Sequence, residues 1–210
     1  LPDVEYKVLG EDGRELGPGH KGELHVRSPQ IMEGYYKKPE ETARVLTEDG
    51  WLNTGDLVLF TYDREFRIVG RSKETIVLLG GENIEPQPIE DAILQSDFID
   101  QVMIVGQDQK YLGALVYPNQ EKMLQFAQDR EIEFVDQEEL RDDQQVRAQI
   151  NREIQDRVNG KTGFKAFEQV FRFALLQEPF EVGEELTQTM KIKRSVVHEK
   201  YHRTISQLFS

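Results

Sequence analysis

The order of strand and helix signals along the chain is the feature that most constrains its fold. Up to residue 69 the pattern is rich in strands, because short apolar runs alternate with turn residues, and one helical segment at residues 40–46 opens after Pro39. From residue 76 onward, strand and helix signals are mixed. This order predicts an α+β protein in two parts, residues 1–69 and residues 76–210, with a polar boundary at residues 70–75.

The individual strands and helices are predicted from the spacing of apolar and turn residues. In the first part, strands are expected at residues 4–9, 23–27, 57–60 and 66–69, with a hairpin turn at Tyr62-Asp63-Arg64. In the second part, strands are expected at residues 76–79, 102–105, 112–117 and 170–176. Helices are expected at residues 88–95, 120–129, 137–158 and 194–208.

Composition narrows the classes of protein that the chain can belong to. The sequence contains no cysteine, so disulfides and thiolate chemistry are excluded and a reducing compartment is permitted. It has neither an apolar run long enough to cross a membrane nor a basic, apolar-centred leader, so we expect a cytoplasmic protein. With a formal net charge of -13, its surface should repel nucleic acid and anionic membranes. No nucleic-acid partner is therefore expected.

A carboxylate and a guanidinium lie in two glycine-containing segments that suit a nucleotide. Asp56 ends the segment Gly50-Trp51-Leu52-Asn53-Thr54-Gly55-Asp56, and Arg71 lies in Gly70-Arg71-Ser72-Lys73-Glu74-Thr75. An ionised aspartate can accept two hydrogen bonds from ribose hydroxyls, and an arginine fork can donate to phosphate or sugar oxygens. An aspartate beside a glycine is more often simple turn chemistry. We expect both groups on short turns flanked by strands.

Several further motifs occur together and in a fixed order. They are Gly22-Glu23-Leu24, Gly34-Tyr35-Tyr36, Pro39-Glu40, Thr42, Thr54-Gly55-Asp56, Gly70-Arg71, Gly80-Gly81-Glu82-Asn83-Ile84, Ile89-Glu90 and Leu186-Thr187-Gln188-Thr189-Met190-Lys191-Ile192-Lys193-Arg194. With these motifs the chain resembles the carboxyl-terminal part of the adenylate-forming enzymes, most closely the long-chain fatty acid-CoA ligases. The chain departs from the family pattern at Glu74, where Asp is common, and at Gln188, where Pro is common.

The resemblance implies an architecture and an activity. Residues 1–69 would be the β-rich end of a large adenylating domain, and residues 76–210 would be a small mobile α+β domain. The family activates a fatty acid with ATP and Mg²⁺ to an acyl-adenylate, and then transfers the acyl group to coenzyme A. A fatty acyl-AMP ligase or an acyl-carrier-protein ligase is the alternative within the family.

The resemblance also implies roles for individual residues. Asp56 would bind the ribose, and Arg71 the ribose or a phosphate. Lys191 would stabilise the adenylation transition state, although a lysine in this setting is most often merely exposed. Lys73 would be the hinge between the two parts. Gly80-Gly81 would line the coenzyme A channel, where isolated glycines most often mark only a turn or bulge.

The sequence contains no phosphate-binding loop of the Gly-x-x-x-x-Gly-Lys or Gly-x-Gly-x-x-Gly type. By resemblance, a Ser/Thr/Gly-rich phosphate loop and most of the acyl pocket would precede Leu1. We therefore expect the chain to be part of a longer ligase and to be inactive alone. Any peripheral membrane contact would come only through the remaining part.

Two rival functions come from other classes. His198-Glu199-Lys200-Tyr201-His202 fits the His-Glu-x-x-His pattern of zinc peptidases, in which two imidazoles share one helix face. The extended form of that motif would need a glycine at Ile205 and a histidine at Leu208, so an exposed helix is favoured and no metal site is expected. The other rival is a non-catalytic interaction module, which would need neither the Asp56 and Arg71 pair nor Lys191.

Overall fold

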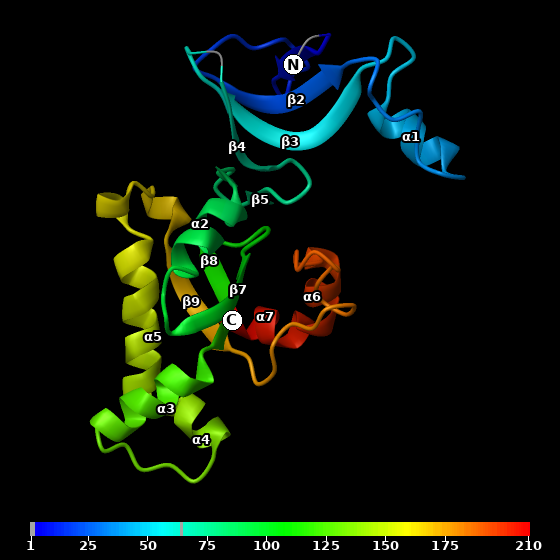
Figure 1. Cartoon of the computed structure of the whole chain (residues 1–210). Helices are drawn as coiled ribbons and strands as arrows, with labels where there is room; N and C mark the ends of the chain where they lie inside the picture. Colours follow the sequence, from blue (N-terminus) through cyan, green and yellow to red (C-terminus); the bar gives the residue numbers. More distant parts are fainter. Residues whose placement is uncertain (1–2, 64) are drawn as a thin grey trace. The chain divides into compact units, whose positions relative to one another are not determined.

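The computed structural model describes residues 3–63 and 65–210. The chain divides into two compact units, Leu1–Thr75 and Ile76–Ser210, each with its own sheet (Figure 1). Strands dominate the first unit, and strands and helices are mixed in the second. The predicted α+β class is confirmed.

The first unit is built on a four-stranded antiparallel sheet whose strands are adjacent in chain order. The strands are β1 (Glu5–Leu9), β2 (Lys21–Arg27), β3 (Leu52–Phe60) and β4 (Phe66–Arg71). Helix α1 (Pro39–Val45) lies between β2 and β3 in the sequence and has its proline in the first turn, where the fixed φ of proline suits a helix.

Three of these strands are longer than the sequence predicts. β2 begins at Lys21 rather than at residue 23. β3 begins at Leu52 rather than at residue 57, and β4 continues to Arg71 rather than ending at residue 69. The prediction was wrong because Gly55 and Gly70 resemble turn residues, yet both lie inside the paired strands. The hairpin turn expected at Tyr62-Asp63-Arg64 includes Arg64, which lies outside the described residues.

The second unit contains a three-stranded sheet with the order β7-β8-β9. β7 (Ile99–Val105) pairs antiparallel with β8 (Leu112–Pro118), and β8 pairs parallel with β9 (Val170–Leu175). A separate small hairpin is formed by β5 (Ile76–Val77) and β6 (Asn83–Ile84). β5 is shorter than the strand expected at residues 76–79, because the chain turns there toward β6.

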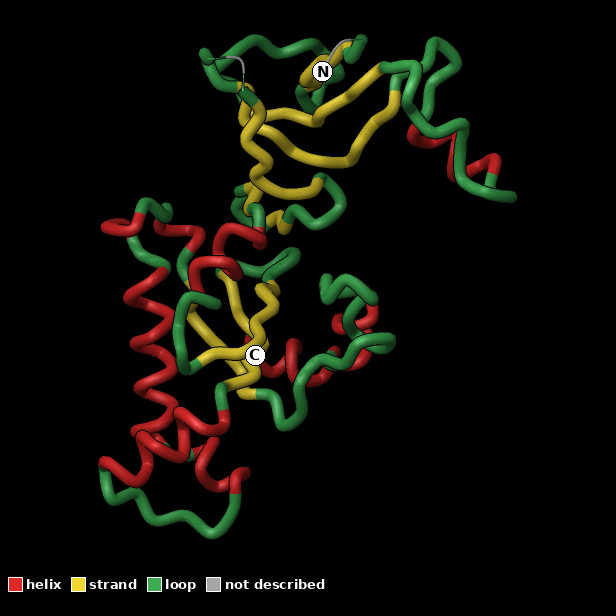
Figure 2. Tube along the Cα trace, viewed as in Figure 1, coloured by secondary structure: helices red, strands yellow, loops and turns green. Residues whose placement is uncertain are grey.

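Helices cover both faces of this sheet (Figure 2). Val102 and Ile104 of β7 pack into one apolar cluster with α2 (Pro86–Ile93) and α5 (Gln144–Arg157). Met103 and Val105 of the same strand pack into a second cluster on the other face, with α6 (Arg194–Lys200) and α7 (His202–Leu208). Side chains alternate along a strand, so burial on both faces explains the continuous apolar run of β7.

The chain between β8 and β9 forms three helices and a third apolar cluster. They are α3 (Gln120–Asp129), α4 (Gln137–Asp142) and α5. The prediction of one helix over residues 137–158 was wrong, because Asp143 interrupts it. The Asp143 carboxylate accepts hydrogen bonds from the backbone N–H groups of Gln145 (2.8 Å) and Val146 (3.1 Å), and so caps the start of α5. Two short 3₁₀ turns, Gly160–Thr162 and Ala166–Glu168, precede β9.

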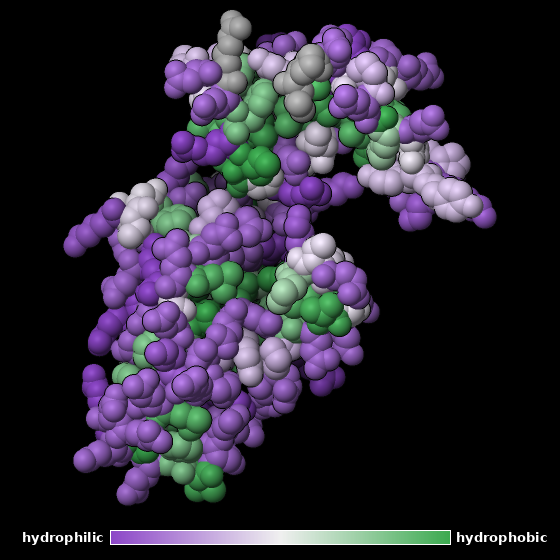
Figure 3. Space-filling view, viewed as in Figure 1, coloured by the Kyte–Doolittle hydropathy of each residue, from purple (hydrophilic) through white to green (hydrophobic). Residues whose placement is uncertain are grey.

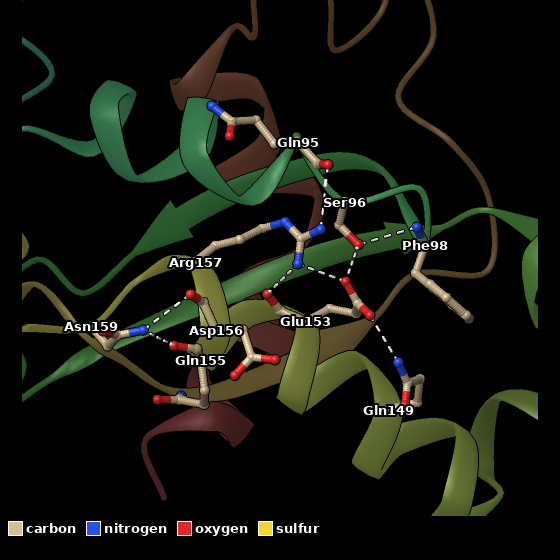
Figure 4. Close-up of polar contacts among 9 residues, drawn as sticks. All are labelled: Gln95, Ser96, Phe98, Gln149, Glu153, Gln155, Asp156, Arg157 and Asn159. Atoms are coloured by element: carbon tan, nitrogen blue, oxygen red, sulfur yellow. Dashed lines mark hydrogen bonds and ion pairs between the residues drawn. The ribbon is translucent and has the colours of Figure 1, made fainter. Parts of the chain in front are cut away.

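A polar network fixes α5 to the turn that follows α2 (Figure 4). The Glu153 carboxylate accepts hydrogen bonds from the Ser96 hydroxyl (2.8 Å) and from Arg157 (2.6 Å). Gln149 donates to the other carboxylate oxygen at 2.8 Å, and Arg157 also reaches the carbonyl of Gln95 at 3.4 Å. The partly buried Glu153 therefore has several partners, which fits a structural role.

The C-terminal helical segment is also divided. The sequence predicts one helix over residues 194–208, but α6 ends at Lys200 and α7 begins at His202, with Tyr201 at φ -103° and ψ 20° between them. Val197, Tyr201 and Leu208 all pack on the second apolar cluster. The bend at Tyr201 lets both halves of the segment follow the sheet, which explains why the prediction was wrong.

Hydrophilic side chains cover most of the surface seen in Figure 3, in keeping with a sequence in which 31% of the residues are charged. Among the described residues, no helix is both long enough and apolar enough to span a membrane.

Candidate functional site

Asp56 and Arg71 form an ion pair across two neighbouring strands of the first unit. They are directly opposite each other in the register of β3 and β4, and Arg71 Nε lies 3.0 Å from Asp56 Oδ1. The Asp56 side chain is 24% exposed and that of Arg71 is 52% exposed. The two candidate groups are thus brought together, but they lie on strands rather than on the turns that the sequence predicts.

The backbone before Asp56 is held by side-chain hydrogen bonds. The Thr54 hydroxyl donates to the carbonyl of Leu24 on β2 (2.8 Å) and accepts from the Asp56 N–H (3.1 Å). Gly55 has φ +70°, and its N–H donates to the Asn53 side chain at 2.7 Å. Because few residues other than glycine adopt this φ, Gly55 can form the turn-like step that sets the direction of the Asp56 side chain.

Glu23 continues this chain of contacts on β2. Its carboxylate accepts a hydrogen bond from Asn53 at 2.9 Å and lies 3.8 Å from Nε2 of His25. Burial, the largest cause, together with the charge of Lys7, lowers the pKa of His25 below its usual value, despite the opposing effect of Glu23. Glu23 therefore supports Asp56 indirectly, through the side chain of Asn53.

The segment after Arg71 contains the predicted hinge residue. The Ser72 N–H donates to the carbonyl of Gly55 (3.0 Å), and the Glu74 N–H donates to the carbonyl of Arg71 (2.9 Å). Lys73 is exposed within this turn, two residues before the first unit ends at Thr75. A hinge role for Lys73 stays a prediction.

Gly80 and Gly81 form the tip of the β5–β6 hairpin in the second unit. The Leu78 N–H donates to the carbonyl of Glu82 (3.1 Å), and the Gly81 N–H donates to the carbonyl of Leu78 (2.9 Å). Gly81 has φ +86°, and a Cβ at Gly80 would meet the Glu82 carboxylate. Gly81 therefore favours glycine because of its backbone conformation, whereas the flexible Glu82 side chain could move away from a Cβ at Gly80. A channel for coenzyme A stays a prediction.

Lys191 lies in a tight, exposed loop of the second unit, between Leu186 and Ile192. Leu186 pairs with Ile192 in an antiparallel bridge, and the Thr187 N–H donates to the carbonyl of Lys191 at 2.8 Å. The Lys191 N–H in turn donates to the Thr187 hydroxyl at 3.0 Å. Met190 has φ +60°, a conformation that is uncommon for a residue with a side chain. The backbone of Lys191 is thus fixed while its side chain extends into solvent.

Two charged side chains hold the segment on either side of this loop. Lys193 donates from Nζ to the carbonyls of Gly183 and Glu184, both at 2.9 Å. The carboxylate of Glu185, which is fully buried, accepts hydrogen bonds from the Glu181 N–H (3.0 Å) and from Lys200 of α6. Burial raises the pKa of Glu185, but these hydrogen bonds outweigh it and leave the pKa below its usual value. The hydrogen bond from Lys200 to Glu185 raises the pKa of the lysine.

Glu90 and Arg194 are two residues whose roles the sequence analysis did not identify. Glu90 is on the buried face of α2 and is 3% exposed. Its carboxylate accepts hydrogen bonds from Arg194 (2.6 Å) and from the backbone N–H of Ile104 (2.7 Å). A detectable signal existed, because Pro86, Ile89, Glu90 and Ile93 have the spacing of a single helix face. A carboxylate on such an apolar face needs a buried partner.

Residues 73–210 match the family described as the AMP-binding enzyme C-terminal domain. The chain belongs to this family. The resemblance based on the ordered motifs is therefore confirmed. The family match covers the whole second unit and the three residues before it.

Relatives extend the likeness to the first unit. The chain is 37% identical to the chloroplastic long-chain-fatty-acid–[acyl-carrier-protein] ligase AEE15 of Arabidopsis thaliana, over 99% of this chain and 28% of the relative. It is 35% identical to long-chain-fatty-acid–CoA ligase 1 of Homo sapiens, over 90% of this chain and 27% of the relative. The chain thus spans less than a third of the length of either ligase.

A solved structure agrees with both units. The adenylation domain of a carboxylic acid reductase from Segniliparus rugosus, in complex with AMP and a co-purified carboxylic acid, matches with a TM-score of 0.82 and 27% identity. The match covers 99% of this chain and 32% of that structure. The likeness therefore extends beyond the C-terminal domain family to the β-rich first unit.

The His-Glu-x-x-His pattern lies across the bend at Tyr201 between α6 and α7. His198 belongs to α6 and is half-buried, whereas His202 opens α7 and is exposed. Nδ1 of His202 lies 3.0 Å from the carbonyl of Glu199. Burial and, to a lesser degree, the charge of Arg194 lower the pKa of His198. The two imidazoles therefore do not share one face of a continuous helix.

Proposed function

We propose that the chain is part of an AMP-forming acid–thiol ligase that activates a long-chain fatty acid with ATP and transfers the acyl group to coenzyme A. The observation that carries this proposal is Lys191, an exposed ammonium on a loop whose backbone is fixed, in a chain that belongs to the AMP-binding enzyme C-terminal domain family. The names of the human and Arabidopsis relatives support fatty acids as the substrate class.

The first proposed step forms the acyl-adenylate. A carboxylate oxygen of the fatty acid attacks the α-phosphorus of ATP, and the bond from that phosphorus to pyrophosphate breaks. Asp56 accepts hydrogen bonds from the ribose hydroxyls, and the Arg71 fork, already beside Asp56, donates to a ribose or phosphate oxygen. The Lys191 ammonium stabilises the negative charge that develops around the α-phosphorus.

The second proposed step forms the thioester. The thiolate sulfur of coenzyme A attacks the acyl carbon, and the bond from that carbon to the AMP oxygen breaks. The tip of the β5–β6 hairpin, Gly80-Gly81, has no side chains that would obstruct the pantetheine arm. For this step the second unit takes another orientation by rotation at Lys73, so that Lys191 acts in adenylation and Gly80-Gly81 in transfer.

Magnesium is implied for the first step by the use of ATP, which binds the ion through its phosphates. In the described part of the chain, no group of three or more histidine, aspartate or glutamate side chains could hold a metal. Magnesium that accompanies ATP is usually held by one or two carboxylates together with the phosphates, and no step is assigned to the ion. The expectation of a cytoplasmic protein without a nucleic-acid partner stays a prediction.

The experiment that tests the proposal is Lys191→Ala in the full-length ligase. Fatty-acid-dependent release of pyrophosphate should fall about 10²- to 10³-fold, because one stabiliser of transition-state charge is lost. Acyl transfer to coenzyme A from supplied acyl-adenylate should be largely spared. Lys161→Ala, which removes an exposed lysine from a 3₁₀ turn of the same unit, is the control. Equal loss of both half-reactions would contradict the role assigned to Lys191.

An acyl-carrier protein is the second candidate acceptor, because one of the relatives is named as a ligase for that acceptor. The two candidates are distinguished by supplying preformed acyl-adenylate with either coenzyme A or a carrier protein that bears the same pantetheine arm. Faster transfer to the carrier protein at equal thiol concentration would replace coenzyme A as the proposed acceptor. It would leave the adenylation step unchanged.

A further inference from the structure

The Lys191 loop is fixed at its base by a buried ion pair to a distant helix. Arg194 is the first residue of α6, three positions after Lys191, and its Nη2 lies 2.6 Å from the Glu90 carboxylate on α2. The side chains of Glu90 and Arg194 are only 5% and 15% exposed. The pair therefore links the two ends of the second unit's sequence, because Glu90 and Arg194 are 104 residues apart.

The pair is also bonded to the central sheet. The backbone N–H of Ile104 donates to Glu90 Oε1 at 2.7 Å, and Nη1 of Arg194 donates to the carbonyl of Ile104 at 3.3 Å. Ile104 is fully buried in the middle of the core. Glu90, Arg194 and the backbone of one β7 residue thus form a closed set of hydrogen bonds, and this set fixes the start of α6 relative to the sheet.

Stability alone is a weak explanation for such a pair. Removing two charges from water has a large desolvation cost, so an apolar pair of similar volume is often as stable or more stable. The polar pair does provide direction, because the arginine fork and the carboxylate meet in a fixed geometry. That direction is passed to the loop through a short connection, since only Ile192 and Lys193 separate Arg194 from Lys191.

We propose that Glu90 and Arg194 are positioning residues for adenylation, which hold the base of the loop so that Lys191 is presented in one place. This inference rests on the proposed function of Lys191. Neither residue needs to touch a substrate. Displacing a stabilising group by about 1 Å can cost about 10²-fold in rate, so a modest shift at the base of the loop is enough to be measured.

The test uses a double variant that removes both charges from the full-length ligase, Glu90→Gln with Arg194→Met. Glutamine still accepts from the Ile104 N–H, and methionine fills the volume of the arginine stem, so no unpaired charge is left buried. The rate of adenylation should fall about 10- to 100-fold, while transfer from supplied acyl-adenylate is largely spared. The melting temperature and the KM for ATP are measured in parallel.

The matched control is the ion pair in Figure 4, changed in the same way, Glu153→Gln with Arg157→Met. This pair has the same 2.6 Å separation in the same unit, but it connects α5 to the turn after α2 and not to the Lys191 loop. It should change the melting temperature and leave the adenylation rate unchanged. A purely structural role for Glu90 and Arg194 would give the same result as this control.

A conservative variant, Arg194→Lys, keeps a charge opposite Glu90 and provides the test if the double variant does not fold. It loses the two-branched contact with Glu90 and Ile104, so adenylation should slow although the protein melts normally. Adenylation at the wild-type rate in a folded variant, or equal loss of adenylation and transfer, would overturn the inference. Lys191→Ala in the same series separates the two proposals: if it blocks adenylation while the paired variants do not, only the positioning role is wrong.

Discussion

The two units hold their candidate functional groups in different ways. In the described part of the first unit, the buried apolar side chains are those of Val8 and Val58, and the Asp56–Arg71 pair is placed by strand register. In the second unit, two apolar clusters cover the two faces of the sheet, and a third lies among the helices between β8 and β9. The Lys191 loop is held by the buried Glu185 and by the Glu90–Arg194 pair. Backbone pairing positions one site, and tertiary packing positions the other.

This difference determines how sensitive each site should be to mutation. A partly exposed ion pair on paired strands contributes little to stability, so it can be changed without unfolding the sheet. A loop held by side chains from α2 and α6 depends on the core beneath it. Mutations far from Lys191 should therefore shift the position of its loop, whereas mutations far from Asp56 in the first unit should shift the Asp56–Arg71 pair less.

The largest expected effect is on the stability of the second unit. Leu115, at the centre of β8, has no exposed surface, so Leu115→Ala should lower the free energy of unfolding by about 2–5 kcal/mol. Ile68→Ala in the first unit, where the side chain is 67% exposed, should change it by about 0.5 kcal/mol or less. Denaturant titration measures both. A comparable loss in the two variants would break the contrast between the units.

The next largest effect is expected from a change at Lys73, in the segment between the two units. Lys73→Pro fixes φ at residue 73 and restricts Ser72, so rotation between the two proposed orientations should be hindered. In the full-length ligase we expect acyl transfer from preformed adenylate to fall about 10²-fold, while a single turnover of pyrophosphate release survives. Lys73→Ala, which leaves the backbone free, is the control. Unchanged transfer in the proline variant would remove Lys73 from the mechanism.

A smaller effect is expected at the partly exposed Asp56–Arg71 pair of the first unit. Asp56→Asn should weaken nucleotide binding by about 1.5–3 kcal/mol, because hydrogen bonds to a charged acceptor are lost. The free energy of unfolding should change by less than about 1 kcal/mol, because the Arg71 side chain is half exposed. Calorimetric titration with AMP measures the first quantity and denaturant titration the second. A loss of stability without a loss of affinity would assign Asp56 to the fold instead.

The smallest effect concerns acid. The folded-state pKa of Glu185 is below its ordinary value of 4.5, so its contribution to stability is present above that pH and is lost as the pH falls through the folded pKa. Glu185→Gln should therefore flatten the loss of stability below about pH 4.5. Glu5→Gln is the control from the first unit, because hydrogen bonding to Arg27 also lowers the pKa of this exposed glutamate. Equal flattening in the two variants would mean that burial of Glu185 does not matter.

Local signals predicted much of the second unit. The helix expected at residues 120–129 matches α3, because Asn119 caps its start by accepting from the Lys122 N–H at 2.9 Å. The split at Asp143 was missed because the apolar spacing of the helix continues past it. Capping aspartates and interior aspartates look alike in a sequence unless the break in periodicity is also visible.

The candidate site was predicted in part. The sequence identified Asp56, Arg71 and Lys191 as candidate residues. The ion pair between the first two follows from the register of β3 and β4. The contact of Arg194 with Glu90 could not be foreseen, because nothing local specifies which of many charged residues meets a partner 104 positions away. Burial of Glu90 on α2 gave a signal that a partner exists, but not its identity.

The parallel pairing of β8 with β9 has a consequence for the order in which the molecule assembles. Residues 119–169 separate the two strands, so their contact closes a long loop, and such contacts form late because the entropy of the intervening chain must first be lost. Lys191 follows β9 in the sequence, and its loop packs on the face of the sheet that β9 completes. We therefore expect a nascent chain to form the paired strands β7 and β8 first, and to place the Lys191 loop only after β9 has joined the sheet.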